Sequence, residues 1–387
     1  MPARTRPPKS RRGVWDPRTA VEENPCNWPG EPVLRPRREP LRADRPLLVD
    51  LFCGAGGFSA GLERAGFEPA LGVDIHLPSI ETYTLNHPRA SAILGDMRRV
   101  DDRLLRRALG ARRVALVTAG VPCQGFSLCN RKRHDGDHRN WLFREFIRAV
   151  RLLRPRLVIL ENVSGLRAAA NGAFARRIEE AIAASGYRVE SRLLNAAEFG
   201  VPQIRRRLFF VGVRDGASIP WPEPTHGPGR RPCVTVAEAI GDLPPLASGE
   251  SARTQVARAV TPYQRLMRDG ADELHNHTAP RHPASTIRRI ARTRPGEPMY
   301  ARFRQRVRLD PDAPSPTQVS GGIRPQFALG HPAQPRGLTI RERCRLQSFP
   351  DRHVICGGIV QGRVQTGNAV PPLLAEALGR ALMSLLD

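Results

Sequence analysis

The chain lacks the features that would place it in a membrane or stabilise it through metals or disulfide bonds. It has no run of eighteen apolar residues, and its N-terminus has no apolar signal core. Its seven cysteines are scattered, without a CxxC pair or a Cys/His cluster with zinc spacing. We therefore expect a cytoplasmic protein with free thiols, no bound metal and no membrane contact.

Lysine is also scarce, because Lys9 and Lys132 are the only two in the 387 residues. Arginine nevertheless brings the formal net charge to +24 and the pI to about 11.3. Such a charge favours a polyanionic partner, nucleic acid above all. A GC-rich genome would also enrich arginine, so the charge supports nucleic-acid binding without proving it.

The character of the chain changes along its length. Residues 1–45 are rich in proline and arginine, and we expect them to form a basic, mostly disordered tail. Short apolar strands alternate with helical stretches from residue 46, which predicts an α/β fold with a parallel, doubly wound sheet. No period persists over 216–335, and regularity returns near the C-terminus. We expect a catalytic domain from 46–215 and 336–387, and a smaller, irregular domain from 216–335.

The irregular region has two interpretations. Eight arginines against one acid lie between Arg288 and Arg308, which favours a domain facing a phosphate backbone. A solvated loop region is the alternative. In the strand-rich part, the predicted strands include 70–76, 92–100, 114–124, 157–163 and 208–214. Polar residues lie at or near strand ends, where open α/β sheets bind ligands: Asp50, Asp74, Asp96, Cys123 and Glu161.

The segment FCGAGG (52–57) predicts a tight turn between a strand and a helix, with backbone amides at the helix N-terminus. Asp74 lies where an acid can bind a ribose diol, which suits a nicotinamide cofactor or S-adenosylmethionine. The GxGG spacing has Ser59 where a dinucleotide fingerprint has glycine, so it favours S-adenosylmethionine. Asp96 could accept a hydrogen bond from an adenine amino group, although a helix-capping aspartate would look the same.

Two further segments bring reactive groups to the same edge. GVPCQGFS places Cys123 just past a strand, and ENV places Glu161 at the end of the next one. QIRRR (203–207) adds fixed cations before a later strand. A thiol, a carboxyl and guanidinium groups beside a nucleoside-cofactor site form a set suited to covalent chemistry on a pyrimidine.

The chain resembles the DNA (cytosine-5) methyltransferase family, in which the fold is a Rossmann-like sheet with a smaller target-recognition domain. The resemblance rests on segments in family order from about 46 to 372: DLFCGAGGFSAG, GVDIH, GDM, GVPCQGFS, ENVSGL, GVPQIRRRLFFVG, RERCRLQSFPD and QTGNAVP. Val121 stands where many relatives have proline, and Asp74 where glutamate is commoner. The letters HNH at 275–277 lack the surroundings of a nuclease site.

The resemblance implies a mechanism. Cys123 would add to carbon 6 of a flipped-out cytosine, and carbon 5 would then accept the methyl group. Glu161 would hold N3 and the exocyclic amine, and Arg207 would contact O2 with Arg205 close by. The cofactor S-adenosylmethionine would be bound by Phe52, Gly54, Ala55, Gly56, Asp74, Ile75, Asp96, Met97, Pro122 and Asn368.

Other functions remain open at this point. A transfer RNA cytosine-5 methyltransferase of the same fold is the first alternative, although the CFT tripeptide of such relatives is missing. An inactive DNA-binding regulator is disfavoured by the intact catalytic set, and a nicotinamide oxidoreductase by the GxGG spacing. We expect a monomer that acts on double-stranded DNA, with a cognate restriction endonuclease acting separately as a candidate partner.

Overall fold

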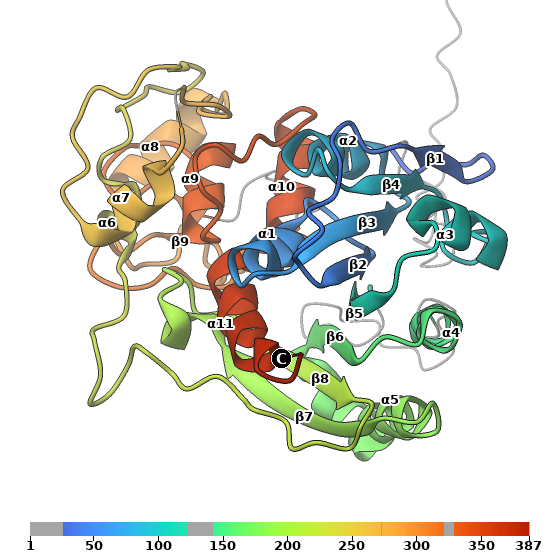
Figure 1. The fold of residues 1–387 in the computed structure, drawn as a ribbon. Helices are drawn as coiled ribbons and strands as arrows, with labels where there is room; N and C mark the ends of the chain where they lie inside the picture. The colour runs from blue at the N-terminus through green and yellow to red at the C-terminus, as the bar shows by residue number, and fades with distance from the viewer. Residues whose placement is uncertain (1–25, 123–141, 272, 321–328, 387) are drawn as a thin grey trace, which may run out of the picture.

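A computed structural model of the protein describes residues 26–122, 142–271, 273–320 and 329–386 (Figure 1). Its centre is one eight-stranded sheet in the order β1-β4-β3-β2-β5-β6-β8-β7. The strands are β1 (Val33–Arg35), β2 (Leu47–Leu51), β3 (Glu68–Asp74), β4 (Ser91–Leu94), β5 (Val114–Gly120), β6 (Leu157–Val163), β7 (Arg188–Asn195) and β8 (Arg206–Val213).

The central strands of the sheet are parallel, and the strands at its two edges are antiparallel to their neighbours. Strands β4, β3, β2, β5 and β6 pair in parallel. Strand β8 lies antiparallel between β6 and β7, and β1 pairs antiparallel with β4. The predicted doubly wound sheet is therefore confirmed in its five central strands. Strand β7 escaped prediction because it is an edge strand, with few buried side chains to give an apolar pattern.

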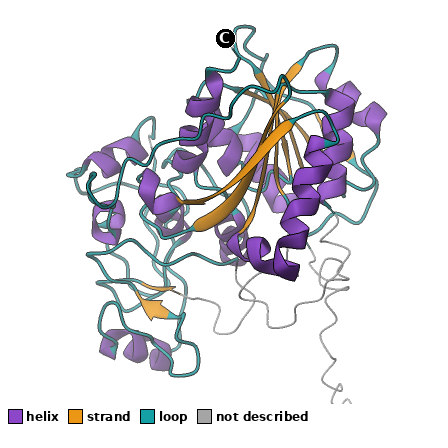
Figure 2. Ribbon diagram, turned by 90° about the horizontal axis from the view of Figure 1, so that it is seen from below, coloured by secondary structure: helices purple, strands orange, loops and turns teal. Residues whose placement is uncertain are grey.

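Helices cover both faces of this sheet (Figure 2). One face carries α3 (Asp102–Leu109), α4 (Phe143–Leu153) and α5 (Ala173–Ala183), whose Leu105, Phe146 and Ile178 are fully buried on it. The other carries α1 (Gly57–Arg64) and α11 (Pro372–Met383). These two helices cross closely, since a Cβ at Gly61 would lie 2.2 Å from the Pro372 carbonyl oxygen. Helix α2 (Leu77–Asn86) and the 3₁₀ segments Ser164–Gly172 and Ala196–Phe199 complete this layer structure.

The expected disordered tail is wrong for residues 26–45. Here β1 extends the sheet, with Val33 opposite Leu94 and Arg35 opposite Ala92. Leu41 is 7% exposed and belongs to the main core. Prolines and arginines concealed this order in the sequence, because a three-residue edge strand needs no apolar period. Residues 1–25 lie outside the described residues.

The smaller part of the molecule, at the left of Figure 1, is more regular than the sequence predicts. It contains α6 (Val236–Ile240), α7 (Pro262–Arg268), α8 (Ala284–Arg292) and the short strands β9 (Val307–Arg308) and β10 (Leu329–Gly330). Capping boxes at Thr235 and Thr261 begin α6 and α7. These helices are too short for a period to stand out. The domain boundaries stay a prediction; Ile219 and Trp221 pack in the core of the large sheet.

The segment around α9 (Ile340–Leu346) joins the two parts, and α10 (Ile359–Asn368) follows it. Leu346 packs in the core of the smaller part. The Arg345 guanidinium is fully buried and binds both carboxylate oxygens of Asp351 at 2.6 Å. It also binds Asp242 at 3.2 Å, just beyond α6. No helix within the described ranges is long and apolar enough to cross a membrane.

Replacing Arg345 with methionine tests this buried ion cluster. The change would leave Asp242 and Asp351 with less compensating charge in the interior, so the free energy of unfolding should fall by about 3–5 kcal/mol. Urea denaturation followed by circular dichroism measures the loss. Arg380→Met is the matched control, because the Arg380 side chain is 68% exposed and pairs with Glu376 of its own helix. Equal losses in both variants would contradict the prediction.

Candidate active site

The glycine-rich turn between β2 and α1 has the strained backbone of a ligand-binding loop. Phe52 has a left-handed φ of 58°, which is unusual for a residue with a side chain. Gly54 and Gly56 also have positive φ values, 52° and 79°. A Cβ at Gly56 would lie 2.6 Å from Nε2 of His87, so the turn requires glycine there. Ala55 is 1% exposed and packs against Ala369 and Phe349 from the C-terminal region.

Two histidines far apart in the sequence support this turn. His353 Nε2 lies 2.9 Å from the carbonyl oxygen of Ala55, and His87 Nε2 lies 3.3 Å from that of Gly56. The His353 ring also packs against that of Phe349, with centroids 4.6 Å apart and the ring planes tilted by 46°. Burial lowers the pKa of His353 well below its usual value, so its ring is neutral. Sequence reasoning missed both residues, since neither lies in a strand-end pattern.

Asp74 ends β3 and connects the turn to the next loop. Its carboxylate accepts hydrogen bonds from the backbone amides of Gly54 and His76, each at 2.8 Å. Burial raises its pKa, although these amide bonds oppose the shift. Ile75 is half-buried beside it. The predicted ribose-binding carboxylate is thus fixed to the glycine-rich turn.

Asp96 lies two residues beyond β4 and has a charged neighbour. The Arg98 guanidinium binds both of its carboxylate oxygens, with Nε 2.9 Å from Oδ2, and holds its pKa below the usual range against the opposing effect of burial. Met97 is 3% exposed, and its side chain packs in the main core. Asp96 therefore lies at the predicted edge, whereas the Met97 side chain is a core contact.

Glu161 and Arg207 meet at the ends of β6 and β8. Arg207 Nε lies 2.9 Å from Glu161 Oε1, and both side chains are largely buried. Burial raises the pKa of Glu161 even though Arg207 and Arg205 oppose the shift. In the sheet register Glu161 stands opposite Gly120, the last residue of β5. The chain then passes through buried Val121 and half-buried Pro122.

Cys123 and Cys129 lie outside the described residues, so their contacts are not part of this geometry. The register still brings the residue before Val121 beside Glu161. Asn162, the next residue in β6, makes a long hydrogen bond of 3.5 Å to the Val121 carbonyl oxygen. Elsewhere, burial raises the pKa of the Cys53 thiol and raises that of Cys344 to about 11. These two thiols are therefore poor nucleophiles.

Arg205 has a different environment from the one expected of a substrate contact. Its guanidinium is fully buried and donates to the backbone carbonyls of Gln318 at 3.2 Å and Gly367 at 3.0 Å. Gln203 Oε1 accepts the Gln318 amide at 2.9 Å, and Gln203 Nε2 donates to Leu346 O at 3.0 Å. Thus QIRRR holds the segment 315–318 of the smaller part against α10.

The C-terminal region packs against the glycine-rich turn, since Ala369 and Phe349 share a core cluster with Ala55. Gly367 touches the smaller part, because a Cβ there would lie 2.3 Å from the Ser320 backbone nitrogen. Asn368 follows as the last residue of α10 and is exposed. The HNH letters at 275–277 are structural, since Asn276 bonds both backbone groups of Ile355 and His277 bonds Thr339 and Pro244. Within the described ranges no cluster of metal-ligating side chains occurs.

The chain belongs to the C-5 cytosine-specific DNA methylase family, whose model matches residues 47–384. It is a DNA cytosine methyltransferase, which confirms the family, the fold class and the enzyme class predicted from the sequence. The Type II methyltransferase M1.HphI of Haemophilus parahaemolyticus is 36% identical over 349 residues, which cover 87% of this chain and 86% of the relative. M.XorII of Xanthomonas oryzae is 34% identical, over 88% of this chain and 85% of its own length.

Solved structures agree. The crystal structure of an Escherichia coli prophage protein described as a DNA modification methyltransferase is 26% identical, with a TM-score of 0.74. It covers 88% of this chain and 99% of its own. DNMT2 of Spodoptera frugiperda, at 15% identity and a TM-score of 0.58, shows the fold alone. The individual roles of the predicted site residues stay predictions.

A buried carboxyl beneath the glycine-rich turn gives a pH-dependent prediction. Asp50 accepts hydrogen bonds from Ser59 and Thr118 at 2.8 and 2.9 Å, and burial raises its pKa to about 6. Between about pH 4 and pH 6 the folded state holds a proton that the unfolded chain has lost, so stability falls as pH rises. One pKa unit corresponds to about 1.4 kcal/mol. Over this pH range the free energy of unfolding of the wild type should therefore fall by about 3 kcal/mol relative to that of Asp50→Asn. Urea denaturation across this pH range tests it; a constant difference contradicts it.

Gln203→Leu tests the contact between QIRRR and the smaller part. Removing the side-chain amide leaves the Gln318 amide and the Leu346 carbonyl unpaired, at a cost of about 1–3 kcal/mol each. We expect the segment 315–318 to shift and the KM for duplex DNA to rise about tenfold, a penalty of about 1.4 kcal/mol. Steady-state methylation assays at varied DNA concentration measure this. A folded variant with the KM of wild type would show that the contact does not position DNA.

Proposed function

We propose that the protein transfers a methyl group from S-adenosylmethionine to carbon 5 of a flipped-out cytosine within a specific duplex sequence. The observation that carries this proposal is the buried pair of Glu161 and Arg207, with 2.9 Å between Oε1 and Nε. It stands directly across the sheet register from the strand end that leads to Cys123. A carboxyl and a fixed cation are thus poised beside the residue proposed as nucleophile.

The Cys123 thiolate adds to carbon 6, and the electron pair of the carbon 5–carbon 6 double bond is displaced toward carbon 5. S-adenosylmethionine, when bound, supplies an electrophilic methyl group. Glu161 holds a proton at N3 as negative charge builds there, a task favoured by its raised pKa. Arg207 binds the cytosine O2. Carbon 5 uses the displaced electron pair to bond the methyl group, whose bond to the sulfonium sulfur would break with its electrons staying on sulfur. Water or another base then takes the proton from carbon 5, and the electron pair left behind re-forms the carbon 5–carbon 6 double bond as the Cys123 thiolate leaves.

The residues around the glycine-rich turn fit an adenosine-methionine ligand. Left-handed residues 52, 54 and 56 let the backbone approach a ligand closely, and Asp74 offers a carboxylate fixed at the strand end. In this arrangement Phe52, Gly54, Ala55 and Gly56 surround the methionine portion. Asp74 binds the ribose hydroxyls and Ile75 packs on the adenine. The Asp96 carboxylate, which already accepts from Arg98, also accepts a hydrogen bond from the adenine amino group. Pro122 and Asn368 close the pocket from β5 and α10.

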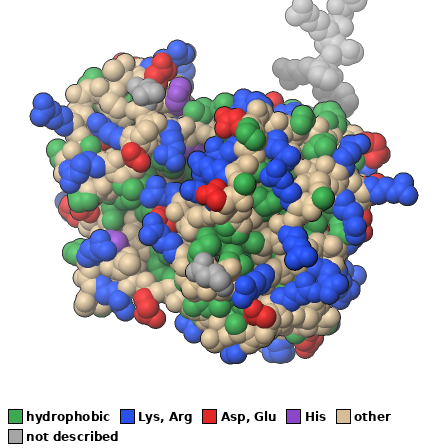
Figure 3. All heavy atoms as spheres, viewed as in Figure 1, with side chains coloured by type: hydrophobic (Ala, Val, Ile, Leu, Met, Phe, Trp, Pro, Cys, Tyr) green, Lys and Arg blue, Asp and Glu red, His purple; other side chains and the backbone are tan. Residues whose placement is uncertain are grey.

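Residues 216–335 form the proposed target-recognition domain. Along and after α8 lies a set of exposed arginines: Arg288, Arg289, Arg292, Arg294, Arg302 and Arg304. Such a set suits contacts with a phosphate backbone, which position the protein without reading sequence. Figure 3 shows basic side chains over much of the visible face, with fewer acidic ones. Arg205, held by backbone carbonyls, positions this domain instead of touching the cytosine.

The relatives support a proposal for the cellular setting. Because they are named Type II methyltransferases, we propose that a separate restriction endonuclease recognises the same sequence. We further propose that the protein acts as a monomer in the cytoplasm. Methylation of the endonuclease's site would then protect the host DNA from cleavage.

Substitution at Cys123 tests the nucleophile. Cys123→Ser should abolish methyl transfer to DNA while binding of S-adenosylmethionine, measured by calorimetry, persists. Glu161→Gln should lower kcat by about 10²–10⁴-fold, because it cannot supply a proton. Incorporation of radiolabelled methyl groups into duplex DNA is the measurement, with transfer RNA as a second substrate.

Cys129→Ser is the matched control and should retain activity, because no role is proposed for that thiol. Full activity in Cys123→Ser would refute the covalent mechanism. Labelling of transfer RNA in preference to DNA would refute the proposed substrate.

A further inference from the structure

Residues 26–38, here called the N-terminal arm, precede the part of the chain that matches the family, which begins at residue 47. The arm crosses the edge of the sheet on the side of β3 and β4. It is attached to each of the loops assigned above to the adenosine portion of the cofactor. Any role of the arm in binding that cofactor therefore rests on the proposed function.

The arm first contacts the loop after β3. The backbone amide of Trp28 donates to the Ile75 carbonyl oxygen at 2.8 Å, and the Leu77 amide donates to Cys26 O at 2.9 Å. Asn27 and His76 form an antiparallel bridge between these bonds. The backbone of Ile75, which follows Asp74, is therefore paired as if in a short ladder. Its position depends on the arm.

The second contact is with the loop after β4. Arg99 Nη1 donates to the carbonyl oxygens of Pro29 and Gly30, each at 3.1 Å, and its other terminal nitrogen pairs with Glu31. Gly95 is pressed against the arm, because a Cβ there would lie 2.9 Å from the Cα of Pro32. The Gly95 amide also donates to the Asp74 carbonyl oxygen at 2.9 Å. The arm, the Asp74 loop and the Asp96 loop thus form one connected layer.

The Trp28 side chain packs on a hydrophobic cluster that includes one residue of the glycine-rich turn. Its indole Nε1 donates to the Glu31 carbonyl oxygen at 2.8 Å. The ring packs on the cluster of Cys53, Ile80, Tyr83, Ala90, Ala92 and Leu94. Cys53 lies between Phe52 and Gly54 of the turn. The same short arm consequently contacts the loops after β3 and β4 and packs on the cluster that includes Cys53 of the glycine-rich turn.

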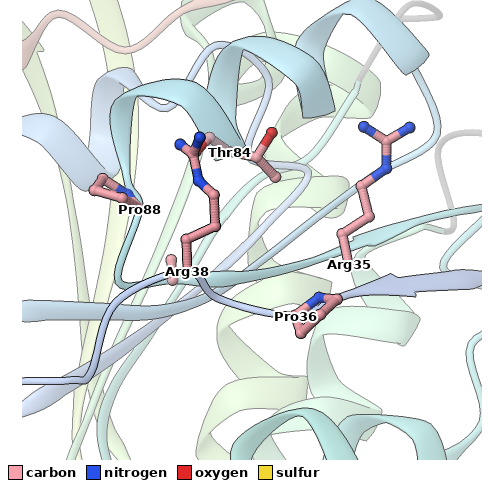
Figure 4. A pocket seen from close by; sticks show the side chains of 6 residues that line it. Arg35, Pro36, Arg38, Thr84 and Pro88 are labelled. Atoms are coloured by element: carbon pink, nitrogen blue, oxygen red, sulfur yellow. The ribbon is translucent and has the colours of Figure 1, made fainter.

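The far end of the arm is anchored to α2. Arg38 donates from its guanidinium to the Thr84 carbonyl oxygen at 2.7 Å and from its backbone amide to Pro88 O at 2.8 Å. Figure 4 shows Arg38 directed toward Thr84 across a small cavity that Arg35, Pro36 and Pro88 also line. Strand β1 pairs with β4 between these points. Both ends of the arm are thereby fixed on the catalytic sheet.

We propose that the N-terminal arm is part of the cofactor site, holding the Asp74 and Asp96 loops at the separation that an adenosine group requires. The positioning residues are Trp28 of the arm, and Gly95 and Arg99 of the loop that the arm holds. If a weakened arm leaves the loops correctly placed only a tenth of the time, the apparent Kd for the cofactor rises about tenfold. Binding of DNA should not change, because the arm lies away from the smaller part.

The test uses the full chain with Gly95→Ala, which pushes Pro32 away, and Arg99→Gln, which removes the contacts to residues 29–31. Calorimetry with S-adenosylhomocysteine should give a Kd about tenfold above wild type for each. The KM for S-adenosylmethionine should rise while the KM for duplex DNA stays constant. Arg106→Gln is the matched control, since Arg106 is exposed on α3 and makes the same charge change. Thermal unfolding of each variant confirms that it is folded.

Tryptophan fluorescence supplies a second readout that a merely structural role would not move. S-adenosylhomocysteine should change the emission of wild type, and Trp28→Phe should remove most of that change. If S-adenosylhomocysteine binds the wild type, and binds both Gly95→Ala and Arg99→Gln with the same Kd, the role of the arm is refuted while the proposed cofactor stands. Failure of wild type to bind S-adenosylhomocysteine would instead contradict the proposed cofactor, and the arm's role with it.

Discussion

Buried guanidinium groups bound to backbone carbonyls hold the active site together. Arg205 binds carbonyls of Gln318 and Gly367, and Arg341 binds those of His275, Pro350 and His353. Each group donates in a fixed fork, so one side chain fixes two or more chain segments at once. An arginine keeps its charge under such burial far more readily than a lysine would. Besides any bias in genome composition, the structure therefore gives a physical reason for arginine instead of lysine at these buried positions.

The parts of the site that local pattern controls could be predicted from the sequence. Asp74 and Glu161 end apolar strands, and parallel strands bring their carboxyl ends to one edge. Gly54 and Gly56 mark a turn that needs left-handed backbone. These features depend on neighbours within a few residues. The family motifs are also short, contiguous segments of sequence, so they were sufficient to identify the enzyme class.

What escaped prediction depends on contacts between distant segments. His87 and His353 reach the glycine-rich turn from α2 and from beyond α9, and no local period announces a histidine that supports a carbonyl. The sequence predicts Arg205 close to the cytosine, but it gives no sign of the carbonyl partners of Arg205, which lie 113 and 162 residues away in the sequence. The arm was expected to be disordered because its composition is polar. Its order comes from pairing with an existing sheet edge.

These long-range contacts fall into separate sets on the two sides of the site. The arm and the two histidines hold the loops on the cofactor side, whereas Gln203, Arg205 and α9 hold the smaller part. The sets meet at α10, where the Gly367 carbonyl oxygen accepts a hydrogen bond from Arg205 and the following residue, Asn368, ends the helix. Glu161 and Arg207 lie on the rigid sheet between them. In the proposed reaction the methyl donor and the target cytosine occupy different sides of the site. Holding each side independently on a common sheet would let either ligand bind without displacing the Glu161 carboxyl and the Arg207 guanidinium, which are proposed to act on the ring.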